Sequence, residues 1–182
     1  MELGETLYVT NRKAWRAWLA RNHAKAKEIW LIYYKKHSGR PRIPYNDAVE
    51  EALCYGWIDS TVKRVDDDRT AQRFSPRRLK SFLSETNKER VRRLIKAKKM
   101  TRVGLEKIQV QLDQEYVHAK DIIAALKKDA KTWKNFQAFP ESYQRIRVGW
   151  IDTSRHRPEI FRQRLRYFLK MTAQNKKFGM VQ

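Results

Sequence analysis

Cysteine, glycine, proline and long apolar runs are all scarce in this chain of 182 residues. Cys54 is the single cysteine, so no internal disulfide can form and a disulfide-stapled scaffold is excluded. Only 6 glycines and 5 prolines interrupt the chain, which favours helices over an all-β barrel or sandwich. The apolar runs are a few residues long, whereas a helix that spans a bilayer needs about 20. The start, MELGETLYVTNRKAWRAWLA, lacks a basic segment followed by an apolar core, so we expect no signal peptide, no membrane span and a cytoplasmic location.

Acidic residues are also scarce. The chain has 20 Asp and Glu against 41 Lys and Arg, which gives a formal net charge of +21 and a pI near 10.3. A field of this sign attracts polyanions and repels cations. The 6 Trp, 8 Tyr and 7 Phe supply enough bulky apolar surface for a folded core.

Strand-like segments lie in the first half of the sequence, and helical periodicity dominates the second. We predict strands at about 7–9, 28–36, 57–65 and 69–74, the last two as a hairpin around the Asp66–Asp68 turn. We predict helices at about 10–21, 44–56, 84–99, 102–114, 121–130, 132–138, 141–152 and 158–174. The fold class is therefore α+β, with a small mixed sheet packed on helices in the N-terminal half and an all-helical C-terminal part. We expect a core domain at 1–116 and a helical extension at 117–182 that packs on it.

Several segments, read in order, resemble the bacteriocin-protection (YdeI/OmpD-associated) family. They are AWL at 17–19, EIWLIYYKK at 28–36, YNDAVEEALCYGWIDS at 45–60 and RFSPRR at 73–78, followed by Ser81, Ser84 and Asn87. The resemblance covers about 10–114, and more weakly 121–175. It departs at Leu83, where the family tends to have Trp, and at Lys98 or Lys99, where it tends to have Gly. The resemblance implies a bacterial cytosolic protein linked to tolerance of antimicrobial peptides or to envelope stress, without an agreed enzyme activity or cofactor.

The first candidate site joins the predicted hairpin to the segment that follows it. Strand alternation places Trp57, Asp59 and Thr61 on one face, with Ile58 and Ser60 on the other. Guanidinium groups bind carboxylates or phosphates through paired donors, and hydroxyl and amide groups add further donors. The alternative is a structural pair between Asp59 and Arg73 or Arg78. The expected anion or ligand pocket comprises Trp57, Asp59, Ser60, Arg73, Ser75, Arg77, Arg78, Ser81 and Asn87.

The second candidate is the basic stretch 69–102, which contains 13 Lys and Arg but only two Glu. On a helix over 84–99, its cations align in a stripe that could follow a phosphate backbone. The alternative is a solvated face on an unusually basic protein. The expected polyanion surface comprises Lys88, Arg92, Lys96, Lys99 and Arg102.

Catalytic patterns are weak. We interpret Cys54 as a core residue at a helix end, and the four histidines lack metal-ligand spacing, so we expect no metal and no cofactor. The leading hypothesis is a stress-associated binding protein that engages a polyanion, DNA or RNA. The alternatives are an uncharacterised enzyme that uses Asp59, Arg73, Arg77 and Ser75, and an adaptor that binds an acidic protein in bacteriocin resistance.

Overall fold

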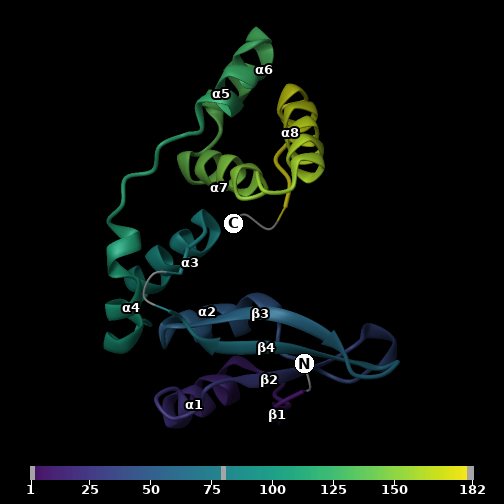
Figure 1. Ribbon diagram of the computed structural model, residues 1–182, viewed down its shortest axis with the longest axis vertical. Helices are drawn as coiled ribbons and strands as arrows, with labels where there is room; N and C mark the ends of the chain where they lie inside the picture. The colour runs from purple at the N-terminus through teal and green to yellow at the C-terminus, as the bar shows by residue number, and fades with distance from the viewer. Residues whose placement is uncertain (1–2, 79–80, 180–182) are drawn as a thin grey trace. The chain divides into compact units, whose positions relative to one another are not determined.

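The computed structural model describes residues 3–78 and 81–179, and it confirms the α+β class (Figure 1). Its contacts divide the chain into two units. The first comprises the residues up to Phe82 together with Arg90–Leu112, and the second comprises Leu83–Glu89 and the residues from Asp113 onward. The predicted split between 116 and 117 stays a prediction. Among the described residues, no helix is long and apolar enough to cross a membrane.

The first unit is built on a mixed sheet, as predicted. Among the described residues it has four strands in the order β1-β2-β4-β3: β1 (Thr6–Leu7), β2 (Ile29–Tyr34), β4 (Arg69–Pro76) and β3 (Trp57–Arg64). β1 runs parallel to β2, and the other neighbours are antiparallel. The hairpin forms without an Asn-Gly pair because the Asp66 carboxylate accepts hydrogen bonds from the backbone N–H groups of Asp68 and Arg69, at 2.9 and 2.7 Å.

A β-bulge interrupts the hairpin. Asp59 pairs with Phe74 but Val62 pairs with Gln72, so two residues of β3 oppose Arg73 alone. The expectation that Thr61 shares a face with Trp57 and Asp59 is therefore wrong, because the extra residue gives that position to Val62. The face that carries Trp57, Asp59, Val62, Gln72 and Phe74 is called the helix face below, and the face that carries Ile58, Arg73 and Ser75 the opposite face.

Two helices cover the helix face, and Figure 1 shows them beside the strands. Asn11 caps the N-terminus of α1 (Arg12–Asn22), where its side chain accepts from the Ala14 N–H at 2.9 Å. Trp15 of α1 meets Phe74 edge to face at 5.4 Å and donates from its indole to the carbonyl of Ala48 in α2 (Tyr45–Cys54). A 3₁₀ turn, η1 (Lys36–Ser38), precedes α2. Gly56 then ends the α2 segment with φ +68°, which lets the chain turn into β3.

Two more helices follow β4. α3 (Glu85–Lys96) ends three residues earlier than predicted, because Lys98 adopts φ 53° and the Lys99 N–H bonds back to the Leu94 carbonyl at 2.9 Å. α4 (Arg102–Leu112) packs closely on the end of α2: a Cβ at Gly104 would lie 2.2 Å from the Cys54 carbonyl oxygen. Glycine is thus the residue that this contact accepts.

Every element of the described second unit is helical, as predicted. After the start of α3 come α5 (Lys120–Lys127), α6 (Ala130–Ala138), α7 (Glu141–Asp152) and α8 (Pro158–Ala173). Their shared core includes Ile122, Leu126, Phe136, Tyr143, Ile151 and Phe168. Pro158 opens α8 at a first-turn position, where its missing N–H costs no helical hydrogen bond.

Candidate anion-binding site

An open hollow of about 540 Å³ lies on the opposite face of the sheet, within the first unit. β4 and the residues after it supply most of its lining, because Arg73 and Ser75 alternate onto this face and the chain then continues past Pro76. Among the described residues, no acidic side chain lines the hollow. Its lining residues are Lys27, Ile58, Arg73, Ser75, Pro76, Arg77, Arg78 and Ser81. Five residues of the expected pocket therefore meet around one space: Arg73, Ser75, Arg77, Arg78 and Ser81.

Arg77 is the most buried cation of this hollow, with 5% of its surface exposed. Its guanidinium donates to the backbone carbonyls of Ser81 and Phe82 at 2.9 and 3.0 Å, and it makes no ion pair with a described carboxylate. Burial lowers the pKa of Arg77, because the charged form loses hydration. An anion in the hollow would offset this loss, since a buried charge without a counter-charge is costly.

The other three cations differ in how they are paired. Arg73 contacts Glu28 through its Nε and Nη2 at 2.7 and 2.5 Å, and this hydrogen bond lowers the pKa of the Glu28 carboxyl. Lys27 and Arg78 are exposed, and neither makes an ion pair with a carboxylate in the described part of the chain. Positive charge at the hollow is therefore only partly neutralised.

The two serines contribute unequally. The Ser81 hydroxyl donates to the Arg78 carbonyl at 2.8 Å, so in this structure its proton is directed to the backbone and not into the hollow. Ser75 is half-buried at the hollow, and its hydroxyl remains available as a donor.

The structure places the other expected pocket residues elsewhere. Asp59 lies on the helix face, where its Oδ2 accepts from the Tyr45 hydroxyl at 2.9 Å and from Gln72 Nε2 at 2.8 Å. The structure therefore places Asp59 away from the cationic hollow, with its carboxylate turned to Tyr45 and Gln72. Trp57 is fully buried in the core. Ser60 is exposed in the bulge, and Asn87 belongs to the second unit.

The expected stripe of cations is interrupted at Lys88. This lysine is 7% exposed and pairs with Glu85 at 2.9 Å, because both side chains turn to the buried side of α3. Arg92 is half-buried, Lys96 is exposed, and Lys99 lies beyond the end of the helix. Arg102 is exposed but pairs with Glu106 at 2.8 Å. Lys80, another cation of the basic stretch, falls outside the described residues.

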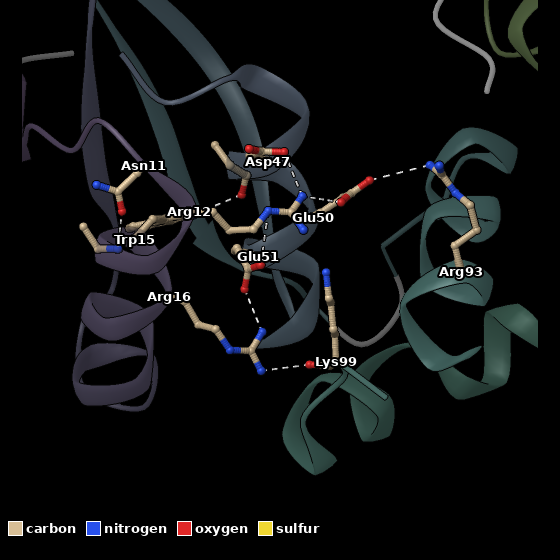
Figure 2. Close-up of polar contacts among 11 residues, drawn as sticks. Asn11, Arg12, Trp15, Arg16, Asp47, Glu50, Glu51, Arg93 and Lys99 are labelled. Carbon is tan, nitrogen blue, oxygen red and sulfur yellow. Dashed lines mark hydrogen bonds and ion pairs between the residues drawn. The ribbon is translucent and has the colours of Figure 1, made fainter. Parts of the chain in front are cut away.

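A network of arginines and carboxylates joins α1 to α2, and sequence reasoning missed it (Figure 2). Arg12 contacts Asp47 at 2.8 Å and Glu50 at 2.5 Å, and Arg16 contacts Glu51 at 2.7 Å. Arg16 also donates to the Lys99 carbonyl at 2.9 Å. The spacing indicates such a network, because the first helix carries two arginines four residues apart and the next helix carries three acids on the side opposite them. These contacts are structural, because the acids satisfy the cations internally.

Two further features bear on chemistry. Burial raises the pKa of the Cys54 thiol to about 11, so the thiol stays protonated at neutral pH. Within residues 3–78 and 81–179, no group of three or more His, Cys, Asp or Glu side chains is arranged to hold a metal ion.

Two family models match the chain. Residues 7–107 match a family described as a domain of unknown function (DUF8412), and residues 115–175 match a family described as bacteriocin-protection, YdeI or OmpD-associated. We expected the resemblance to the bacteriocin-protection family mainly over residues 10–114, whereas the model of that family matches residues 115–175. Neither a curated protein nor a solved structure matches the chain.

Proposed function

We propose that this chain, which belongs to the DUF8412 family, is a YdeI-type protein that binds a phosphate-bearing polyanion. Its residues 115–175 match the bacteriocin-protection, YdeI or OmpD-associated family. The phosphate occupies the cationic hollow, and the polyanion is a nucleic acid. The protein acts in the cytoplasm, where nucleic acids are abundant.

One observation carries this proposal. The hollow gathers Lys27, Arg77 and Arg78, none of which pairs with a described carboxylate, although Arg12 and Arg16 of the same unit are paired. Unpaired cations around an open space suit an external anion. Guanidinium forks fit phosphate oxygens, and Ser75 adds a neutral donor.

The net charge of +21 favours a long anion over a small one, since such a field concentrates polyanions near the surface. Contacts to phosphates alone give affinity without reading the bases. We therefore expect binding that depends little on nucleotide sequence and strongly on salt.

The test measures the affinity for a fluorescent DNA duplex at several salt concentrations. The double variant Lys27→Gln with Arg78→Gln removes two charges from the hollow. The control, Arg21→Gln with Lys25→Gln, removes two exposed charges that do not line it. The hollow variant should bind at least about tenfold more weakly and lose about two units of salt slope, while the control keeps the wild-type slope.

Equal weakening of both variants would mean that net charge alone attracts DNA, and the hollow would lose its role. Poly-glutamate, which carries carboxylates and no phosphate, tests the acidic-protein alternative. If it displaces DNA at equal charge concentration, the preference for phosphate is wrong.

A further inference from the structure

A second hollow lies on the helix face, on the other side of the sheet from the anion hollow. It has a volume of about 260 Å³ and is lined by Tyr33, Arg42, Pro44, Tyr45, Val62, Thr70 and Gln72. Register explains the lining: Tyr33 pairs with Thr70 across β2 and β4, and the bulge brings Val62 opposite Gln72. Its volume exceeds that of a few water molecules, which occupy about 30 Å³ each in the liquid.

The Tyr33 hydroxyl is the unusual group of this hollow. Tyr33 is 7% exposed, and its hydroxyl is buried without a hydrogen-bond partner in the part of the chain that the structure describes. Buried polar groups are normally bonded, so an orphaned hydroxyl beside a hollow calls for a partner. Burial, followed by the charge of Asp59, raises the pKa of Tyr33, so the hydroxyl keeps its proton and can act as a donor.

Charges of opposite sign flank this hydroxyl. Arg42 is exposed, lines the hollow and donates to the Tyr34 carbonyl at 3.3 Å. On the other side, Asp59 holds the Tyr45 hydroxyl and Gln72 Nε2, both through Oδ2. Because Gln72 uses its nitrogen for Asp59, its amide oxygen remains an acceptor. The hollow thus offers the Tyr33 hydroxyl donor near the Arg42 cation, and the Gln72 amide oxygen acceptor near the Asp59 anion.

We propose that this hollow binds a small zwitterion of the amino-acid class. The ligand carboxylate contacts Arg42 and the Tyr33 hydroxyl, and the ligand ammonium group contacts the Gln72 carbonyl oxygen beside Asp59. A simple anion would be repelled by Asp59, and a simple cation by Arg42. A zwitterion satisfies both charges and gives the Tyr33 hydroxyl the acceptor that it lacks.

The first experiment uses the full chain and each of the twenty L-amino acids at one concentration. Thermal shift finds the amino acids that raise the melting temperature, and calorimetry measures their Kd. Propionate and ethylammonium serve as half-ligands, since each carries one charge of a zwitterion. We expect at least one amino acid to stabilise the protein while neither half-ligand does. If no amino acid stabilises the protein, or if propionate binds as tightly as the best amino acid, the proposal is overturned.

Variants then locate the site. Tyr33→Phe and Arg42→Gln should each weaken binding at least about tenfold, because each removes a donor to the ligand carboxylate. The matched controls, Tyr34→Phe and Arg40→Gln, change neighbouring residues that do not line the hollow and should keep the wild-type Kd. Without ligand, Tyr33→Phe should melt no lower than wild type, because it removes an orphaned hydroxyl.

Unchanged amino-acid binding in Tyr33→Phe overturns the site. The variant Lys27→Gln with Arg78→Gln lies on the opposite face and should keep the wild-type Kd for amino acids. Failure of DNA binding and failure of amino-acid binding are therefore distinguishable.

Discussion

Glu51 is the buried centre of the network between α1 and α2, and its replacement tests the account of that network. Its side chain is 2% exposed and lies 2.7 Å from Arg16 and 3.5 Å from Arg12 (Figure 2). Glu51→Gln keeps the shape but removes the charge. Removing one partner of a fully buried pair costs about 3–5 kcal/mol. Because the two arginines are 28% and 36% exposed, water recovers part of this loss, and we expect about 2 kcal/mol.

Urea unfolding followed by tryptophan fluorescence measures this change in the free energy of unfolding. The matched control is Glu106→Gln, whose pair with Arg102 is exposed and should contribute at most about 0.5 kcal/mol. The double variant with Arg16→Gln should cost less than the sum of the two single variants, since the two side chains interact directly. A loss for Glu51→Gln no larger than that for Glu106→Gln would falsify the network.

Two further predictions concern Gly104 and Cys54. Gly104→Ala should lower the free energy of unfolding by about 3 kcal/mol, because the new Cβ meets the Cys54 carbonyl. Gly39→Ala, in open space at φ +66°, should lower it by about 1–2 kcal/mol. If chemical denaturation finds Gly39→Ala the more destabilising of the two, the close packing at Gly104 is wrong. The pKa of Cys54 is about 11 when folded against about 8.5 when unfolded, so the unfolded chain loses its proton first and stability should fall as pH rises between these values. Cys54→Ala should flatten that part of the pH profile measured by thermal unfolding, and an unchanged profile refutes the assignment.

Helices and strands were predictable because their signals are local. A side-chain cap at Thr10 or Asn11, the aromatic and β-branched run of β2 and the three- and four-residue spacing in α8 each follow from neighbours in sequence, and the structure places the cap at Asn11. The end of α3 was predicted too late, because Lys98 adopts a left-handed conformation that is not expected from a lysine in the sequence.

Residues of the anion hollow were predictable where they follow one another along the chain. Arg73 and Ser75 reach the hollow by strand alternation, and Arg77 and Arg78 follow directly after the end of the same strand, so closeness in sequence brings the four together. Lys27 and Ile58 come from other segments, and only the pairing of the strands places them there. The burial of Lys88 depends on which face of α3 packs, which the sequence pattern does not encode. The network around Glu51 has a signal in the spacing of its arginines and acids, but its contacts also require that α1 packs on α2.

The bulge in β3 has a consequence for how the two hollows keep separate characters. If every residue of β3 were paired one-for-one from the Arg64–Thr70 pair, with no bulge, Asp59 would stand opposite Ser75, and Trp57 would leave the core. Deletion of Thr61 would remove the bulge, leave Ser60 alone opposite Arg73 and keep Asp59 opposite Phe74 on the helix face. By absorbing one extra residue, the bulge acts as a partition that keeps the Asp59 carboxylate on one side of the sheet and the Arg73 guanidinium on the other.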